Sequence, residues 1–272
     1  MALRLAVSGA TGRMGQMILG LAAKDPRFEI VGALENSNHP SLGKNLGEVL
    51  PSLGAQKATV ESDPAQFAQK PQVLIDFTQP AATMGYLEKA QALGFGMVVG
   101  TTGLSDAEKQ KVRAAGEKVP LVMATNMSLG MNLLFALVEE AAAKLGPAYD
   151  AEIVEAHHHF KKDAPSGSAL SLGESVARAW KVRLSDVATH GREGLVGERK
   201  AGTIGFHAVR GGDIVGDHTV MLVGTGERLE LTHRAQSREA FAQGALAAAH
   251  FLGSKSKGFY DMQDVLGLRA SK

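Results

Sequence analysis

The sequence contains no cysteine, which excludes disulfide bonds and thiolate metal ligands. This absence is compatible with the reducing cytoplasm, which is the location we expect. An excess of charge of either sign is also missing, because 29 Lys and Arg residues face 28 Asp and Glu residues, a formal net charge of +1. No overall field therefore draws the protein to nucleic acid or to an anionic membrane, and an anionic ligand must be bound by local groups.

Long hydrophobic runs are absent as well. No stretch approaches the roughly 18 consecutive apolar residues of a membrane span. The apolar start, Met1–Val7, is too short and too soon followed by Ser8 and Gly9 to be a secretory signal. What the sequence does contain is 272 residues, 44% of them hydrophobic and 21% charged, which is typical of a globular protein with a substantial core. This length fits one large domain or two modest ones, and we favour two.

Short apolar runs alternate with segments of helical periodicity through about residue 127. A helix is predicted over 16–24, a second over 81–93, and a third after Ser105, where Glu108 three residues later completes a capping box. The apolar runs between them are Leu3–Val7, Phe28–Leu34, Val73–Phe77, Gly96–Gly100 and Leu121–Met123. This alternation predicts a parallel, doubly wound sheet of the Rossmann type.

The pattern changes after residue 127. A strand is predicted over 151–156, a helix over 169–180, and several β-rich runs broken by glycines over 202–235, which together indicate an α+β domain with a mixed or antiparallel sheet. The Ala-rich segment 238–253 is again helical and can return to the first domain. The sequence therefore predicts an α/β protein with one domain formed by 1–127 and 239–272 and a second formed by 128–238.

A glycine-rich turn connects the first predicted strand to the first helix. Gly9, Gly12 and Gly15 form G-x-x-G-x-x-G, which differs from the common G-x-G-x-x-G spacing but has the same strand-to-helix context. Glycines let the backbone approach a diphosphate closely, and the helix N-terminus presents unpaired N–H groups to it. Glu35, at the end of the second strand, can accept hydrogen bonds from ribose hydroxyls. A plain glycine turn with a solvated glutamate is the alternative, and the combination favours a dinucleotide site.

The residue after Glu35 bears on the choice of coenzyme. Asn36 stands where an arginine would favour the 2′-phosphate of NADPH, so NADH is expected as the coenzyme at least as strongly as NADPH. Arg13, inside the glycine turn, can still contact a phosphate. The expected cofactor is thus NADH or NADPH.

Three consecutive histidines, His157–His159, suggest a metal site at first, because imidazole is a common metal ligand. On a strand, His157 and His159 would share one side while His158 points away, and neither cysteine nor an H-E-x-x-H spacing is present. We therefore expect no metal. Structural or surface histidines are the remaining alternative to a catalytic role.

The residues that follow favour catalysis. Lys161 lies four residues after His157, and the Ser166-Gly167-Ser168 sequence then leads into a helix, where N–H and hydroxyl groups can bind a carboxylate. Histidine and lysine can supply protons to an acceptor held there. Lys161 could alternatively form a Schiff base with a carbonyl substrate.

The segment Glu155–Ala169, with the sequence EAHHHFKKDAPSGSA, resembles the dihydrodipicolinate reductase family, now called 4-hydroxy-tetrahydrodipicolinate reductases. Matching motifs extend over nearly the whole chain, at 9–14, 76–78, 100–103, 124–127, 202–206 and 212–218. The resemblance implies a Rossmann domain closed by the C-terminal tail, and a substrate domain whose sheet builds a homotetramer. It also implies a role in lysine and diaminopimelate synthesis.

The resemblance further implies roles for individual residues. His157 would be a proton donor or acceptor and Lys161 a proton donor, while His158, Gly167 and Ser168 would contact a small dicarboxylate substrate. The cofactor would be bound by Gly9, Ala10, Thr11, Gly12, Arg13, Met14, Glu35, Gly100, Thr101, Thr102, Ala124, Thr125, Asn126 and Met127. The sequence departs from the family at His159 and Phe160, which replace a common His-Arg-His order, and at Asn36, which replaces a frequent arginine.

In the reaction of that family, a cyclic unsaturated imine dicarboxylate is reduced with loss of water. Hydride delivery to ring carbon C4 pushes electrons through the conjugated system, and either His157 or Lys161 would supply the proton that follows. Lys161 and the donors at Gly167 and Ser168 would offset the substrate carboxylates. The rival interpretations are a different two-domain dehydrogenase, which would share only the first domain, and a nucleotide-sensing protein in which 157–168 is an interaction loop.

Overall fold

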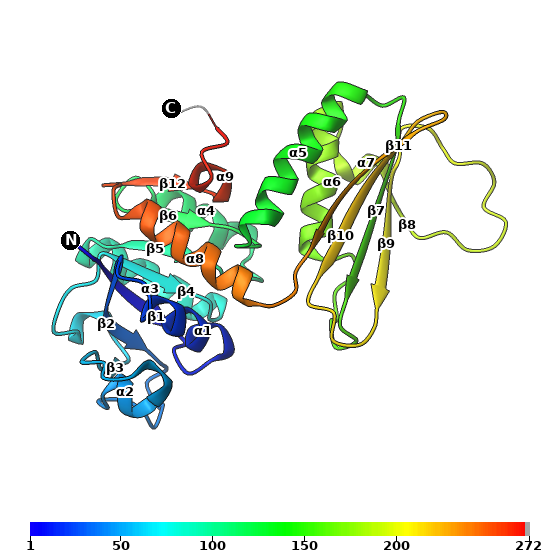
Figure 1. Ribbon diagram of the computed structural model, residues 1–272. Helices are drawn as coiled ribbons and strands as arrows, with labels where there is room; N and C mark the ends of the chain where they lie inside the picture. The colour runs from blue at the N-terminus through cyan, green and yellow to red at the C-terminus, as the bar shows by residue number, and fades with distance from the viewer. Residues whose placement is uncertain (270–272) are drawn as a thin grey trace. The chain divides into compact units, whose positions relative to one another are not determined.

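The computed structural model describes residues 1–269, and the chain divides into two compact units. Met1–Leu129 and the segment from Glu239 onward form the first unit, and Gly130–Arg238 form the second. In Figure 1 the chain leaves the first unit at the start of helix α5 (Leu129–Leu145) and returns to it with helix α8 (Glu239–Leu252). The predicted class, α/β with one parallel and one mixed sheet, is confirmed.

The first unit is built on a seven-stranded sheet in which every pairing is parallel. Its order is β12-β6-β5-β4-β1-β2-β3. The strands are β1 (Leu3–Ser8), β2 (Phe28–Leu34), β3 (Val60–Glu61), β4 (Val73–Asp76), β5 (Gly96–Val99), β6 (Pro120–Met123) and β12 (Gly258–Tyr260). The order reverses direction between β1 and β4, and ligands of such sheets bind beyond the carboxyl ends of the strands at this point.

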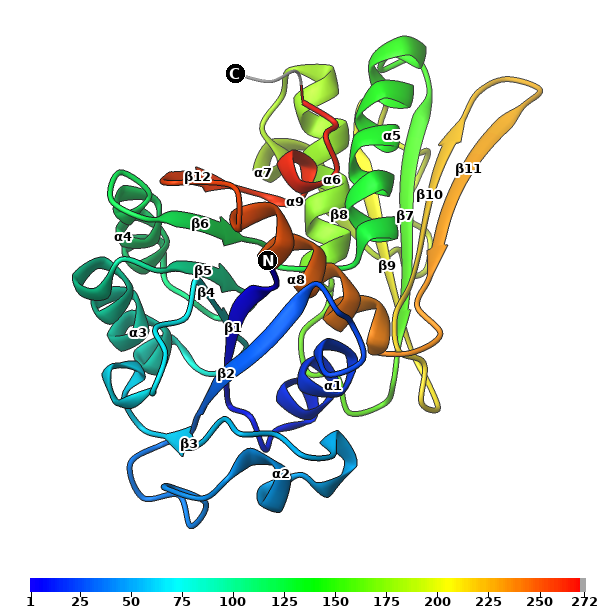
Figure 2. The ribbon, with the colours of Figure 1, turned by 60° about the vertical axis from the view of Figure 1, so that its left-hand side comes forward.

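Helices cover both faces of this sheet because its strands are apolar on both sides. On β5, Val98 packs with the core beneath α1 and α8, whereas Met97 and Val99 pack with the core beneath α3 and α4. Figure 2 shows these two pairs of helices on opposite sides of the sheet. The helical elements of the unit are α1 (Arg13–Ala22), α2 (Leu46–Val49), η1 (Pro51–Leu53), η2 (Pro64–Gln66), α3 (Pro80–Leu93), α4 (Asp106–Ala115), α8 and α9 (Met262–Val265).

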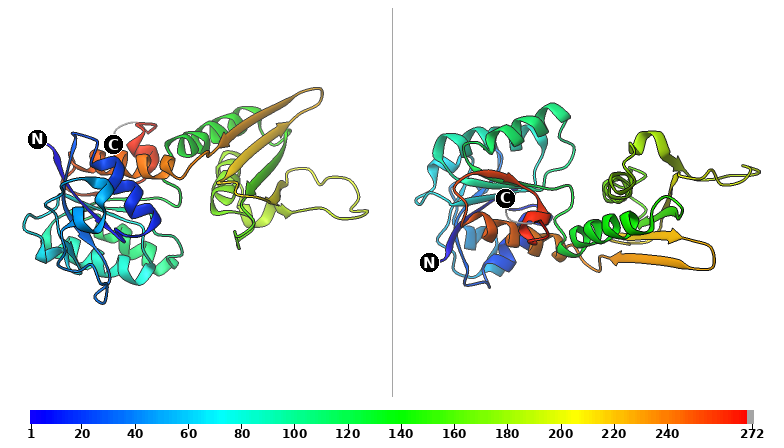
Figure 3. Two further views of the ribbon diagram at one scale, coloured as in Figure 1. Left: turned by 60° about the horizontal axis from the view of Figure 1, so that its bottom comes forward. Right: turned by 90° about the horizontal axis from the view of Figure 1, so that it is seen from above.

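The second unit is a five-stranded mixed sheet with two long helices on one face. Its order is β11-β10-β7-β9-β8, with β7 parallel to β9 and antiparallel to β10. Helices α5 and α6 pack on the sheet through one apolar core, and Figure 3 shows them on the same side of the strands. The remaining elements are β7 (Asp150–His157), α6 (Gly167–Trp180), α7 (Leu184–Val187), β8 (Ala188–His190), β9 (Ile204–Arg210), β10 (Asp217–Val223) and β11 (Arg228–Arg234).

Strand β7 runs from the apolar core of the second unit to the candidate site. Its side chains alternate between the two faces of the sheet, so Ala151, Ile153, Glu155 and His157 all lie on the helix-covered face. The first two are fully buried in the apolar core, and the next two are also buried although they are ionisable. The strand therefore delivers Glu155 and His157 to the polar end of the core.

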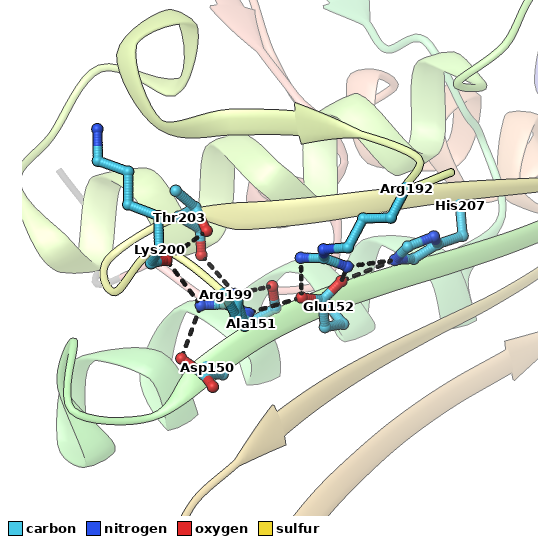
Figure 4. Close-up of polar contacts among 8 residues, drawn as sticks. All are labelled: Asp150, Ala151, Glu152, Arg192, Arg199, Lys200, Thr203 and His207. Atoms are coloured by element: carbon cyan, nitrogen blue, oxygen red, sulfur yellow. Dashed lines mark hydrogen bonds and ion pairs between the residues drawn. The ribbon is translucent and has the colours of Figure 1, made fainter. Parts of the chain in front are cut away.

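The opposite face of the same strand holds an ion cluster centred on Glu152. Its carboxylate accepts hydrogen bonds from Arg192 and Arg199, which lie in the loop between β8 and β9, and it contacts His207 of β9 (Figure 4). Burial alone would raise the pKa of Glu152, but these contacts outweigh it and lower the pKa to about 2. Gly205 makes room for the carboxylate, because a Cβ there would lie 1.8 Å from Glu152 Oε2. The cluster ties the loop to the sheet.

The close approach of α8 to the first sheet depends on Gly244. A Cβ at this position would lie 1.7 Å from the carbonyl oxygen of Met127. We expect Gly244→Ala to lower the free energy of unfolding by at least about 2 kcal/mol, because the helix must move away. Gly20 of α1, where an added Cβ would meet no atom within 4 Å, is the matched control. Gly20→Ala should raise stability by about 0.5 kcal/mol through helix propensity. Chemical denaturation tests both, and equal stabilities of the two variants would contradict the expectation.

Candidate functional site

The glycine turn after β1 forms a cradle at the start of α1. Gly9 has a φ of 62°, and its N–H donates to the carbonyl of Leu34 over 2.9 Å. A Cβ on Gly15 would lie 2.1 Å from the carbonyl oxygen of Gly9, so only glycine lets the helix begin against the turn. Gly12 is the N-cap and offers no side chain to the first-turn N–H groups, which a helix cannot bond internally. This arrangement fits a diphosphate.

Glu35 lies beside the same turn, at the end of β2. Its Oε1 accepts hydrogen bonds from the N–H of Thr11 at 2.8 Å and from the Thr11 hydroxyl at 2.7 Å. The carboxylate is thus attached to the turn through one oxygen, and its other oxygen is chemically able to accept hydrogen bonds. His39 was missed by the sequence interpretation, although its Nε2 lies 3.4 Å from Thr11 Oγ1 and places an imidazole next to this acceptor.

The other predicted cofactor residues follow the carboxyl ends of β1, β5 and β6 but differ in what they offer. Ala10 and Met127 are buried in the core, so they support the loops of this edge from below. Gly100 leaves space for a neighbouring ring, because a Cβ there would lie 2.4 Å from Phe77. The remaining predicted positions at this edge are Arg13, Met14, Thr101, Thr102, Ala124, Thr125 and Asn126.

Asp76, to which the sequence pattern gives no role, joins these loops. The side chain is fully buried at the end of β4, and its carboxylate is surrounded by hydroxyl groups. Ser8 and Thr78 donate to Oδ1 at 2.6 Å, and Thr83 and Thr101 donate to Oδ2 at 2.5 and 3.1 Å. One carboxylate therefore holds together the ends of β1, β4 and β5, around the point where the strand order reverses.

In the second unit, His157 is held by a buried carboxylate. Its Nδ1 lies 2.6 Å from Oε2 of Glu155, which is only 1% exposed. Arg210 donates two hydrogen bonds of 2.8 Å to the same carboxylate, and the N–H of Ser166 donates to Oε1 at 3.1 Å. These residues come from β7, β9 and the start of α6, so the contact joins three elements.

Burial and hydrogen bonding together determine the pKa values of Glu155 and His157. Burial would raise the pKa of Glu155, but the hydrogen bonds from Arg210 and His157 outweigh it, and the pKa is lowered. Burial lowers the pKa of His157, against the opposing effect of Glu155. Glu155 is therefore a carboxylate at neutral pH, while the imidazole can give and take a proton.

The start of α6 is fixed by a second imidazole. The Ser166 hydroxyl caps the helix by accepting from the N–H of Ala169 at 3.1 Å, and it lies 3.0 Å from Nε2 of His218 on β10. Burial, followed by the proximity of His157, lowers the pKa of His218 to about 4. A neutral His218 can accept a hydrogen bond from the Ser166 hydroxyl. This contact holds the first turn of α6, at Gly167 and Ser168, in place.

The structure corrects one expectation about the histidines. Strand β7 ends at His157, so His158 and His159 follow in a turn and do not alternate across a strand. The turn forms because the N–H groups of His158 and His159 donate to carbonyls of the segment between β9 and β10. Within residues 1–269 no group of three or more His, Asp or Glu side chains is placed to hold a metal ion.

Lys161 follows this turn and lies near His157, whose pKa its charge lowers. Its Nζ is 2.9 Å from Oδ1 of Asp163, and its side chain is 20% exposed. Arg210, which binds Glu155, also donates to the Asp163 carbonyl over 2.7 Å. The predicted residues His157, Lys161, Gly167 and Ser168 therefore surround one network. The sequence pattern predicted no role for Glu155, the centre of this network, although Glu155 lies in the motif 155–169.

Taken together, a parallel sheet with a glycine-turn cradle and a second unit with titratable side chains near a helix N-terminus are the features of a two-domain nicotinamide-dependent oxidoreductase. The chain belongs to the dihydrodipicolinate reductase family. Residues 3–127 match the N-terminal domain of that family and residues 130–266 match its C-terminal domain.

Individual relatives agree with this assignment. The chain is 50% identical over 270 residues to the 4-hydroxy-tetrahydrodipicolinate reductase of Thiobacillus denitrificans, covering 99% of this chain and 100% of the relative. It is 48% identical to that of Paraburkholderia phymatum, covering 98% and 100%. A solved dipicolinate-bound dihydrodipicolinate reductase from Paenisporosarcina sp. TG-14 has a TM-score of 0.76 at 25% identity, covering 97% of this chain and 99% of that one. Among residues 1–269, no helix has the length and apolar character to span a membrane.

The buried His218 predicts how stability depends on pH. The unfolded imidazole binds a proton below about pH 6.5, whereas the folded one does so only below about pH 4. Lowering the pH through this window therefore favours unfolding, by about 3 kcal/mol from this group. His218→Asn should flatten the fall in unfolding free energy between pH 7 and pH 4, measured by chemical denaturation at each pH. A variant with the same pH dependence as the wild type would contradict the expectation.

Proposed function

We propose that this protein reduces 4-hydroxy-tetrahydrodipicolinate to tetrahydrodipicolinate with loss of water, using NADH or NADPH, in the synthesis of lysine and diaminopimelate. The observation that carries the proposal is that one buried carboxylate, Glu155, holds His157 and the start of α6, with Lys161 close enough to His157 for its charge to lower the pKa of the imidazole. Its chemistry suits a small dicarboxylate that must be reduced and protonated. The dipicolinate bound to the Paenisporosarcina relative, itself a dicarboxylate, supports the same substrate class.

The cofactor site proposed is the carboxyl edge of the first sheet. The glycine turn from Gly9 to Met14 would bind the diphosphate through its backbone and the start of α1, and Glu35 would bind the adenosine ribose. The segments 100–102 and 124–127 would line the remainder of the cofactor. The bound nicotinamide supplies the hydride that reduces the substrate.

The substrate site proposed is the end of β7 with the start of α6. Gly167 and Ser168 lie in the first turn of α6, where backbone N–H groups and the positive end of the helix dipole can bind one carboxylate. The Lys161 ammonium and the His158 side chain would contact the substrate beside it. Because Lys161 pairs with Asp163 in this structure, it would exchange that partner for the substrate.

The proton that completes the reduction would come from His157 or Lys161. The Nδ1 of His157 faces Glu155, which leaves Nε2 to transfer a proton. The Lys161 ammonium is a donor with no acceptor role. The positive charge of Lys161 would also offset the negative charge that develops on the substrate ring.

The assembly and location proposed are a homotetramer in the cytoplasm. The face of the second sheet opposite α5 and α6 carries Val209, which is 49% exposed, and such a face can pair with other copies. A biosynthetic reductase that consumes NADH or NADPH would draw on the cytoplasmic pool. The net charge of +1 gives no support to a nucleic-acid partner.

Lys161 provides the direct test of the substrate site. Lys161→Ala should lower kcat/KM with 4-hydroxy-tetrahydrodipicolinate at least roughly a hundredfold, because a carboxylate partner and a proton donor are both lost. NADH affinity should be nearly unchanged. The neighbouring Lys162, which is exposed, supplies the control Lys162→Ala with expected wild-type activity. Equal activity of the two variants in steady-state assays would remove Lys161 from the mechanism.

Glu35 provides the test of the cofactor site. Glu35→Ala should weaken NADH binding by at least about tenfold and NADPH binding less, because the carboxylate repels a 2′-phosphate while it binds a 2′-hydroxyl. Glu29, exposed at the other end of β2, is the control, and Glu29→Ala should leave both affinities unchanged. The affinities are measured by titration calorimetry. An NADH affinity that survives the loss of Glu35 would contradict the ribose assignment.

A further inference from the structure

We propose that Glu155 is the positioning residue of the substrate site, fixing the ring of His157 and the first turn of α6 at the same time, while Arg210 holds Glu155 in place. The inference rests on the proposed function, because it takes His157 and the start of α6 as the groups that transfer a proton and bind a carboxylate. Glu155 itself takes no part in hydride transfer or in proton transfer. It acts through the groups that it orients.

The first argument is the placement of the three side chains on the sheet. Glu155 and His157 are two residues apart on β7 and therefore share the helix-covered face. Arg210 pairs in register with His157 on the parallel strand β9, which brings its guanidinium over the Glu155 carboxylate. A charge that is only 1% exposed is stable in such a place only when it is paired and hydrogen-bonded.

The second argument is the hydrogen-bond inventory of the carboxylate. Oε1 accepts from the N–H of Ser166 and from one Arg210 nitrogen, and Oε2 accepts from the other Arg210 nitrogen and faces His157 Nδ1. A carboxylate can only accept, so the proton of the neutral imidazole must be on Nδ1. Nε2 is then the basic nitrogen, as a group that receives and returns a proton requires.

The third argument is the space around that nitrogen. A Cβ at Gly216 would lie 3.0 Å from Nε2 of His157, so the glycine keeps the nitrogen free of a covering side chain. The charged and titratable groups that face His157 are Glu155 on its own strand, Arg210 on β9, His218 on β10 and Lys161 in the turn. Among these groups, only Glu155 is hydrogen-bonded to the ring. The loss of Glu155 should therefore change the orientation and tautomer of the ring most.

The same carboxylate also reaches the carboxylate-binding end of the site. Its contact with the Ser166 N–H fixes the N-cap of α6, directly before Gly167 and Ser168. Arg210 extends the network to the backbone carbonyl of Asp163, whose side chain pairs with Lys161. One buried ion pair thus sets the spacing between the imidazole and the helix start.

The direct test is the tautomer of His157, read from the ¹⁵N chemical shifts of histidine-labelled protein without any substrate. In the wild type the neutral ring should carry its proton on Nδ1, and a proton on Nε2 would overturn the proposal without the need for a variant. In Glu155→Gln, the new amide should turn its NH₂ group toward Nδ1 and give up one hydrogen bond from Arg210, while its oxygen keeps those from Ser166 and from the other Arg210 nitrogen. The proton should then move to Nε2, and retention of the wild-type tautomer would overturn the proposal.

Glu152 supplies the matched control, because it is also a shielded carboxylate of β7 with arginine partners, but on the opposite face (Figure 4). Glu152→Gln should leave the His157 shifts at their wild-type values. If the two variants changed those shifts equally, the effect would be a general disturbance of the strand, and the positioning role would be rejected.

Binding and turnover test the link to the helix. Glu155→Gln should weaken binding of dipicolinate and lower kcat/KM at least roughly tenfold, with the pH profile displaced toward lower pH because the imidazole loses a neighbouring negative charge. Arg210→Gln should add little to this in the Glu155→Gln background, since it acts through the same carboxylate. Fully additive losses would contradict that. The tautomer requires no turnover, so failure of the reductase assignment and failure of this proposal are distinguishable.

Discussion

The ion pair between Glu155 and Arg210 is the constraint on which the proposed substrate site depends. Apolar residues fill the helix-covered face of β7 up to Ile153, and the next side chain on that face is a carboxylate. Removing one partner of such a buried pair typically costs about 3–5 kcal/mol, so the pair must form when the unit folds. Because β9 runs parallel to β7, the guanidinium arrives at the level of His157, and folding of the sheet assembles the site.

The first unit places buried carboxylates at its ligand edge with a different kind of compensation. Asp76 is surrounded by hydroxyl groups from the ends of β1, β4 and β5, and the N–H and hydroxyl of Thr11 bind one oxygen of Glu35. Neutral donors hold the loops together, and among residues 1–269 no arginine or lysine forms an ion pair with either carboxylate. That suits the proposed cofactor site, in which the acceptor must remain available to the ribose of the dinucleotide.

The sequence predicted those features that depend on local pattern. Alternating apolar runs located five strands of the first sheet, and the capping box at Ser105 is present. Helix α5 was not predicted, because exposed Leu133 and Leu137 obscure its apolar face, and the three half-buried residues of β12 give no strand pattern. The pairing of Glu155 with Arg210 was also missed, since 55 residues separate them and only the register of β7 and β9 brings them together.

The central claim is that hydride passes from the nicotinamide to a ring carbon of the dicarboxylate substrate. It is tested most directly by supplying NADH deuterated at both C4 positions with freshly generated 4-hydroxy-tetrahydrodipicolinate and analysing the product by mass spectrometry and NMR. The account predicts tetrahydrodipicolinate that carries one deuterium at ring carbon C4. Cofactor binding without oxidation, or a product that contains no deuterium, would contradict it.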